Sequence, residues 1–310
     1  MSYELRQDET VGRGVQRVVC AQLKAAIHAS GAKQNGEGSP VHETRKHLKK
    51  ARAALRLAAG AVGCDTWKRE DRRLAKVGKL VSEVRDAEVR LQTVRQLRQF
   101  ARGRRRSFRE TEELLAFELD SFLAAFSEWP EEAKQRLTQA LDRIEAWPLE
   151  DLRCKQMRQC VQKTYQRGRT ALQTALEKTS TKKLHTFRKR AKELGYQLRI
   201  LQPLAPAVFA EMTDELKTIG QYLGQIHDLA FVADRLASMG GARKRGDRIL
   251  YSLVDSREKE LERTAIALGE RFYAERPRQF ARRLSQYFSE WEKAKRRTVS
   301  SDSRRVALLN

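Results

Sequence analysis

Residues 41–58 read VHETRKHLKKARAALRLA, and the predicted organisation of the chain is built around this stretch. A helix turns by about 100° per residue, which would place two different faces side by side here. The first face is apolar apart from one threonine and consists of Val41, Thr44, Leu48, Ala51, Leu55 and Ala58. The second is a strip about 80° wide that carries His42, Arg45, Lys49, Arg52 and Arg56, with Lys46 beside it. The stretch is therefore predicted to form an amphipathic helix with one cationic face.

A row of cations on one helix is unfavourable by itself. Like charges three or four residues apart repel each other and destabilise the helix. Two interpretations of the cationic strip follow. Either an anion lies against the strip and offsets the repulsion, or the strip is an ordinary basic surface in contact with water.

A second copy of the strip lies 143 positions further along the chain. Residues 184–201 read LHTFRKRAKELGYQLRIL, and six of the eighteen positions match the first stretch. The matching residues are His185, Arg188, Lys189, Lys192, Leu198 and Arg199. Five of these six are basic residues or histidine, whereas a repeat kept only for packing would preserve apolar positions first. The repeat therefore favours a shared ligand-binding role for the two strips.

Another pair of segments repeats at nearly the same distance. Residues 74–89 (LAKVGKLVSEVRDAEV) align with residues 216–231 (LKTIGQYLGQIHDLAF) at a shift of 142. Gly78 then meets Gly220, and Asp86 meets Asp228. The chain is thus predicted to consist of two related halves, residues 1–147 and 148–292. A polar, basic tail, residues 293–310, follows them and is expected to be loosely held.

These repeats resemble the CHAD family, the conserved histidine α-helical domains. One marker is the pattern H-x-x-R-[KV]-x-x-[KR], which opens each basic helix at His42 and at His185. The other is an L-G-x-x-x-D type segment later in each half. The resemblance covers nearly the whole chain and implies a single domain over residues 1–310. It also implies two antiparallel four-helix bundles related by a pseudo-twofold axis, a basic groove or pore between them, and binding of inorganic polyphosphate.

Two positions depart from the family pattern. Gly195 stands where the first copy has Arg52, so the second strip has one cation fewer. Ser82 replaces the glycine of the L-G-x-x-x-D segment in the first half.

The composition agrees with a polyanionic partner. The 310 residues include 63 Lys and Arg against 40 Asp and Glu, which gives a net charge of +23, and both halves are basic. Such a field attracts nucleic acid, polyphosphate or an acidic membrane surface. No apolar run reaches the roughly 18 residues of a membrane span, and the first residues, MSYELRQDET, have no apolar core of a signal peptide. We therefore expect a cytoplasmic protein without membrane partners, and, if the resemblance holds, one that collects on polyphosphate granules.

The remaining patterns are also helical, so the predicted fold class is all-α. Residues 67–100 read as one long helix, either straight or kinked, and residues 111–127 as an amphipathic helix whose aromatic residues lie in the core. Between them, residues 102–109 (RGRRRSFR) form a dense basic cluster. The four cysteines, Cys20, Cys64, Cys154 and Cys160, form no C-x-x-C pair and are predicted to be free thiols.

No catalytic motif stands out. His42, Glu43 and His47 resemble a zinc-peptidase H-E-x-x-H motif, but the second histidine is five residues on, about 140° away from the first. There is no phosphate-binding loop of the type G-x-x-x-x-G-K-[ST]. Asp86 and Asp228 could act as bases, but we expect them to hold a neighbouring cation or cap a turn. The chain is therefore predicted to be a binding protein, with no metal and no cofactor, rather than an enzyme.

The hypothesis for the site is a polyphosphate chain between the two basic helices. Arginine donates in a fork that matches phosphate oxygens, and lysine acts as a mobile charge. The predicted ligand contacts are His42, Arg45, Lys46, Lys49, Arg52, Arg56, His185, Arg188, Lys189, Lys192, Tyr196 and Arg199, with possible further contacts from Lys50, Tyr165 and Arg169. Two alternatives stay open: a nucleic-acid-binding protein, and a helical scaffold for a protein partner. The sequence leaves the length of the polyphosphate, the binding of nucleotides or inositol phosphates, and the oligomeric state open.

Overall fold

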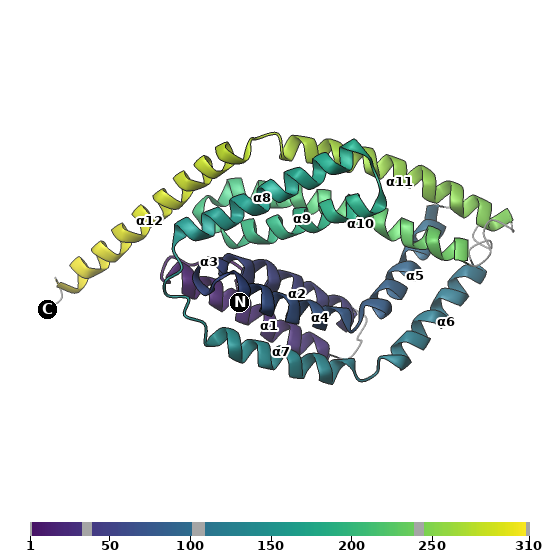
Figure 1. The fold of residues 1–310 in the computed structure, drawn as a ribbon, viewed down its shortest axis with the longest axis horizontal. Coiled ribbons are helices and arrows are strands. Elements are labelled where there is room, and N and C mark those ends of the chain that lie inside the picture. The colour runs from purple at the N-terminus through teal and green to yellow at the C-terminus, as the bar shows by residue number, and fades with distance from the viewer. Residues whose placement is uncertain (1, 33–38, 101–108, 239–244, 308–310) are drawn as a thin grey trace.

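The protein is built from helices that follow one another with short connections (Figure 1). The computed structural model describes residues 2–32, 39–100, 109–238 and 245–307. The helices are α1 (Val11–Ser30), α2 (Pro40–Leu57), α3 (Ala59–Val62), α4 (Cys64–Lys79), α5 (Ser82–Phe100), α6 (Arg109–Ala125), α7 (Trp129–Glu145), α8 (Cys154–Glu177), α9 (Thr181–Ile200), α10 (Pro206–Ser238), α11 (Arg245–Phe272) and α12 (Pro277–Ala307), with a 3₁₀ turn at Gln202–Leu204. Within the described ranges every regular element is helical, which confirms the all-α class.

Serine caps fix where the two basic helices begin. The Ser39 hydroxyl accepts a hydrogen bond from the backbone N–H of His42 (3.3 Å), and Pro40 occupies the first turn of α2. Ser180 does the same for Lys183 at the start of α9 (3.4 Å). An N-cap of this kind satisfies one of the unpaired amides of a helix start. As a result His42 and His185 lie close to the N-terminal ends of their helices.

Helices of the first half pack mainly on one another. α1 lies against α2 and α7, and α4 also lies against α2 and α7. The contact between α4 and α7 includes Glu70, which is 3% exposed. Arg143 of α7 donates to both carboxylate oxygens of Glu70 (2.8 and 3.0 Å), and Arg73 donates to one of them (3.0 Å). This pairing allows a charged residue to be buried between the two helices.

The second half has its own set of contacts. α8 lies against α9, α11 and α12, and α10 lies against α9 and α11. Tyr165 of α8 is 1% exposed, stacks on Phe280 of α12 with 4.1 Å between ring centroids, and donates its hydroxyl to the backbone oxygen of Glu275 (2.8 Å). An aromatic ring at this position therefore belongs to the core of the second half.

Residues 67–100 do not form the single long helix that the sequence predicts, because the chain breaks between α4 and α5. In a continuous helix the carbonyls of Gly78 and Lys79 would accept from the backbone N–H groups four residues on. Here the Arg45 guanidinium donates to the Gly78 oxygen, and the Ser82 hydroxyl donates to the Lys79 oxygen (2.9 Å). Two side chains thus replace the backbone donors, and α5 turns toward α10, with which it is in contact.

The two halves share one continuous core. α2 packs on α9 and α8, and Gln197 of α9 donates to the backbone oxygen of Ala53 (3.3 Å) within that interface. The N-terminal segment, residues 2–10, joins the same two helices. Tyr3 donates its hydroxyl to the Lys50 oxygen (3.0 Å), and the Leu5 N–H donates to the Ile200 oxygen (2.9 Å). These contacts fix how α2 and α9 lie relative to each other.

Two regions add to what the sequence suggests. α12 continues through Ala307 as a helix and reaches away from the body, so the segment expected to be a loosely held tail is helical over residues 293–307 (Figure 1). α6 buries Leu115 but leaves Phe117 71% exposed. The prediction that the aromatic residues of this helix lie in the core is therefore wrong for Phe117, because among the described residues α5 is the main packing partner of α6. Residues 102–108 of the basic cluster lie outside the described residues.

Candidate functional site

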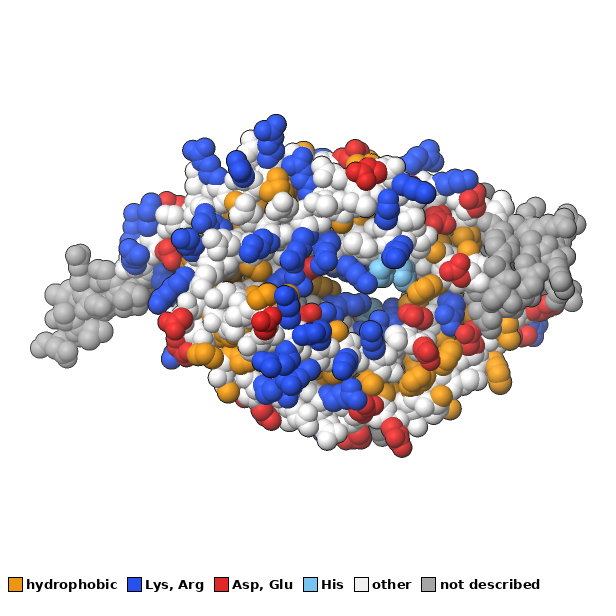
Figure 2. Space-filling model, in the orientation of Figure 1, with side chains coloured by type: hydrophobic (Ala, Val, Ile, Leu, Met, Phe, Trp, Pro, Cys, Tyr) orange, Lys and Arg blue, Asp and Glu red, His pale blue; other side chains and the backbone are white. Residues whose placement is uncertain are grey.

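Helices α2, α5, α9 and α10 surround a cavity of about 680 Å³, and α4 adds Asp71 to its lining. α2 contacts α9, α9 contacts α10, α10 contacts α5, and α5 contacts α2, so the ring is closed. Figure 2 shows this face hollowed at its centre, with Lys, Arg and His side chains around the hollow. Both basic helices, α2 and α9, are part of the ring. The two cationic strips that the sequence repeats therefore lie in one cavity.

Most of the predicted contact residues line this cavity. They are His42, Arg45, Lys46, Lys49, Arg52, Arg56, His185, Arg188, Lys189, Lys192 and Tyr196, together with Lys50. Three predicted residues do not. Arg199 pairs with Glu4 (3.1 Å), and Tyr165 lies in the core described above. Arg169 donates to the backbone oxygen of Glu275 (3.4 Å). Tyr165 and Arg169 lie on the face of α8 that packs toward α11 and α12, so helical spacing alone placed them wrongly.

The cavity also contains residues that the sequence prediction missed. Arg85 of α5 and His227 and Phe231 of α10 line it, as does Arg190 of α9. Arg85 and His227 occupy equivalent positions at the shift of 142, directly before Asp86 and Asp228. The alignment of residues 74–89 with residues 216–231 thus contained the information needed to predict these two residues.

Basic groups far outnumber acidic ones in the lining. Eleven Lys and Arg side chains face the cavity, against the four carboxylates of Asp71, Asp86, Glu193 and Asp228. Some cations already have a partner. Arg52 donates to both oxygens of Asp71 (2.8 and 3.0 Å), Arg56 pairs with Glu193, and Lys46 pairs with Glu43 outside the lining (2.9 Å). These paired groups are held in place before any ligand arrives.

Another group of cations has no such partner. Among the described residues, no carboxylate lies within ion-pair distance of Lys49, Arg188, Lys189 or Lys192. Burial, followed by repulsion from Lys192, Arg45 and Arg188, lowers the pKa of Lys49 to about 7. Burial and the nearby Arg188 lower the pKa of Lys192 to about 8, against the attraction of Asp228. A cluster of cations that repel one another around an open space is suited to binding an anion.

The histidines border the same space. His185 and His227 stack with 4.4 Å between their centroids and 27° between their planes, and Phe231 meets the ring of His227 edge-on at 4.3 Å. Burial and the neighbouring His227 lower the pKa of His185 to about 4, so its imidazole is neutral near pH 7. Burial and then Arg85 lower the pKa of His42. Neutral imidazoles can still donate a hydrogen bond to an anionic oxygen.

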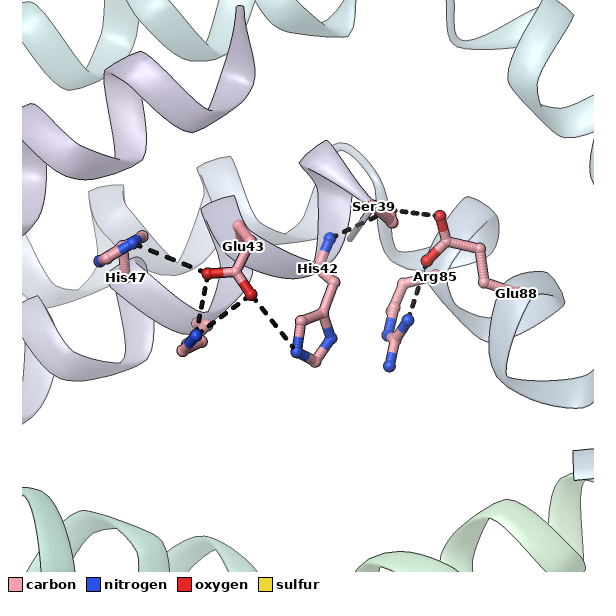
Figure 3. A network of polar contacts seen from close by, with 7 residues as sticks. Ser39, His42, Glu43, His47, Arg85 and Glu88 are labelled. Carbon is pink, nitrogen blue, oxygen red and sulfur yellow. Dashed lines mark hydrogen bonds and ion pairs between the residues drawn. The ribbon is translucent and has the colours of Figure 1, made fainter. Parts of the chain in front are cut away.

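Figure 3 shows the surroundings of His42 at the start of α2. Glu43 lies between His42 and His47, with 3.9 Å from its carboxylate to each ring, and it also binds Lys46. The Ser39 hydroxyl contacts Glu88, which in turn accepts from Arg85 (2.9 Å). Across the described part of the chain, no group of three or more His, Cys, Asp or Glu residues is arranged to hold a metal ion. Those same residues include no helix that is long and apolar enough to cross a membrane.

Comparison with known proteins identifies the family. The model of the CHAD domain matches residues 18–237, which is more than half of the chain. The chain belongs to the CHAD family. Its structure is similar to that of PptA from Streptomyces chartreusis, with a TM-score of 0.58 and 15% sequence identity over 86% of this chain and 100% of that one. At that identity the likeness concerns the fold alone. No curated protein matches the sequence.

One glycine of this CHAD domain has a steric role in the cavity. A Cβ atom at Gly224 of α10 would lie 2.8 Å from the Arg188 guanidinium. The absence of a side chain therefore lets Arg188 lie directly against α10, near Asp228, whose charge attracts it. In the first half Ser82 occupies the equivalent position, but there Arg45 bonds the Gly78 oxygen at the helix break instead. The first half thus has Ser82 in place of a glycine, and its arginine, Arg45, is held by a backbone oxygen rather than against the facing helix as Arg188 is.

Proposed function

We propose that this CHAD domain binds inorganic polyphosphate in the cavity between α2, α5, α9 and α10. The observation that carries the proposal is the set of cations from both basic helices that face one open space and, among the described residues, have no carboxylate within ion-pair distance, chiefly Lys49, Arg188, Lys189 and Lys192. Polyphosphate offers only anionic oxygens and no bases. Arg and Lys donors on opposite walls match such a ligand, because they can contact oxygens on both sides of the chain.

The proposal includes the internal symmetry of the chain. The halves 1–147 and 148–292 would be repeated helical bundles related by a pseudo-twofold axis, each contributing one basic helix to the groove. The shared spacing of His42 and His185, and of Asp86 and Asp228, supports this relation. A ligand without direction or sequence, such as polyphosphate, suits a groove with two similar walls.

Binding without catalysis is the second part of the proposal. The carboxylates of the cavity have charge partners: Asp71 binds Arg52, while the charges of Asp86 and Asp228 attract Arg45 and Arg188. Carboxylates arranged in this way hold the cationic donors in place and are not arranged to act as bases that activate water. The proposal extends to a cytoplasmic protein that collects on polyphosphate granules, where the polymer is concentrated.

Removal of four cavity cations tests the assignment. In the variant Arg45→Ala, Lys49→Ala, Arg188→Ala and Lys192→Ala, affinity for long-chain polyphosphate should fall by at least about a hundredfold, a total loss of about 2.8 kcal/mol or more over the four charged contacts. The matched control removes two arginines and two lysines elsewhere: Arg109, Arg257, Lys259 and Lys293, all exposed and paired with acidic neighbours. Both variants lose the same charge, so equal affinities would contradict a specific site.

Nucleic acid is the second candidate, and the net charge of +23 is the observation that favours it. Its phosphates would meet the same cations, and both polymers would bind in a salt-dependent manner. Within the described residues the cavity has only Tyr196, Phe231 and the histidines as aromatic groups. We therefore expect nucleic acid to be a weaker competitor for the same site.

A further inference from the structure

We propose that anion binding in this cavity takes up protons, which enter at Lys49, Lys192 and the stacked ring of His185. The inference rests on the proposed function and concerns how the same site is regulated. It makes the affinity for polyphosphate dependent on pH in the neutral to mildly basic range.

The first support is the geometry around Lys49. Arg45 on the same helix, Arg85 on α5, and Arg188 and Lys192 on α9 all act on Lys49 with the same charge. No acidic group is among the main influences on it. Two carboxylates of the cavity lining act on other cations, since Asp86 attracts Arg45 and Asp228 attracts Arg188. Lys49 therefore has four like charges around it and no acidic group among the main influences that would offset them.

Lys192 has a similar position on the opposite helix. Arg188 on its own helix and Arg85 on α5 repel its charge, and Asp228 on α10 attracts it. The methylene groups of Lys192 lie 3.4 Å from where a Cβ of Gly220 would be, so the side chain runs along α10. The ammonium groups of Lys49 and Lys192 thus repel each other in a region where few negative charges offset them. The least costly adjustment for an empty cavity is the loss of a proton from one of them.

The histidine pair gives independent support. Two rings stacked at 4.4 Å cannot both carry a positive charge without strong repulsion. Lys49, Arg188 and Lys189 also act on His185 with the same sign. The Nδ1 atoms of His185 and His227 are both buried without a hydrogen-bond partner, although Asp228 lies 3.6 Å from that of His227. His185 is therefore neutral near pH 7 in the empty cavity, and both rings have an unused nitrogen atom.

A polyanion reverses this balance. Its charges compensate the cations, so the protonated forms of the lysines and of one histidine become favourable. By linkage, the affinity falls as the pH rises above the ligand-free pKa of each group that gains a proton on binding. Those values are about 7 for Lys49 and about 8 for Lys192. The protons come from water and buffer, and no covalent step is involved.

Calorimetric titration with long-chain polyphosphate tests the inference on the intact protein. Runs at about pH 8 in buffers with different heats of ionisation give the number of protons exchanged. We expect uptake of about one proton per cavity, and an affinity that falls on going from about pH 7 to about pH 9. Long chains keep the titratable end groups of the ligand few. Tight binding with no proton exchange would overturn the inference and leave the proposed function intact, whereas absence of binding would overturn both.

A charge-preserving variant assigns the protons. In Lys49→Arg with Lys192→Arg the cations remain, but guanidinium groups stay protonated throughout this range. The proton uptake per bound polyphosphate, measured at saturation at about pH 8, should fall to less than half of the wild-type value, whatever the affinity of this variant. The same uptake as in the wild type would show that the lysines are not its source. The buffer series on the wild type needs no substitution, so the inference can fail even where the variant does not fold.

Discussion

At the scale of single residues, Gly224 gives a sharp test of how Arg188 is positioned. Gly224→Ala would bring a methyl group to within 2.8 Å of the Arg188 guanidinium, which is the movable end of a long side chain. Helix α10 should not be destabilised, because alanine favours a helix over glycine by up to about 1 kcal/mol. Arg188, however, must move away. We expect the affinity for polyphosphate to fall by about three- to tenfold, with an unchanged or higher melting temperature.

Gly195→Ala is the matched control, since a Cβ there would lie at an ordinary 3.5 Å from Leu216. It should have a similar effect on the melting temperature and none on affinity. Equal affinity for both variants would show that the position of Arg188 against α10 does not matter for binding.

The residues of the site could be predicted from sequence only where the repeat preserved them. Helical periodicity and the shift of 143 give the strips of α2 and α9, and these do line the cavity. Neither pattern distinguishes Arg52, which Asp71 holds, from Lys49, which has no acidic partner. That difference arises from Asp71 on α4, a helix that is not one of the two helices with the repeated basic strips. Tyr165 was misplaced because helical spacing is the same whether a tyrosine directs its hydroxyl into a groove or packs its ring in the core.

At the scale of helices, Glu70 holds α4 against α7. Glu70→Gln should reduce the free energy of unfolding by about 3 kcal/mol, because it leaves Arg143 and Arg73 without their buried counter-charge. Denaturant unfolding measures the loss. Polyphosphate affinity should change little, since Glu70 is not part of the cavity lining.

Glu131→Gln on α7 serves as control for this prediction. Its side chain is 83% exposed and pairs with Lys134 at 3.9 Å, an interaction of small value. We expect a change within about 0.5 kcal/mol. A loss at Glu70 as small as the loss at Glu131 would contradict the structural role of the buried carboxylate.

Helix boundaries were predictable where local chemistry determines them. Ser39 caps α2 and Pro40 opens it, and both residue types are typical of a helix start, so this boundary depends on local sequence alone. The break between α4 and α5 could not be predicted in the same way, because its main side-chain donor is Arg45 on another helix. The exposure of Phe117 on α6 likewise depends on which helices cover that face, which periodicity does not show.

At the scale of the whole molecule, the crowded cations should make the ligand-free protein more stable at mildly basic pH. The pKa of Lys49 is about 7 in the fold and lies well below its ordinary value of 10.5. The unfolded chain therefore binds more protons between these values, and the stability rises with pH there. We expect the melting temperature to increase from about pH 7 to about pH 8.5, and saturating polyphosphate to abolish the increase.

The variant Lys49→Met separates this effect from the general charge of the protein. It removes the cation and keeps the length of the side chain, so the ligand-free protein should be more stable at about pH 7 and depend less on pH. Its polyphosphate affinity should be lower, as is common where a site is kept at the expense of stability. A ligand-free melting temperature that falls steadily over this range in the wild type would contradict the account.

The most direct test of the central claim is a competition titration at about 0.15 M salt. Long-chain polyphosphate would compete with single-stranded RNA of matched charge for the purified protein. We predict that polyphosphate binds at least tenfold more tightly, a difference of about 1.4 kcal/mol, and that the Arg45, Lys49, Arg188 and Lys192 alanine variant loses this preference. Equal affinity of the two polymers would contradict a phosphate-chain receptor and leave the charge of +23 as a general attraction for polyanions.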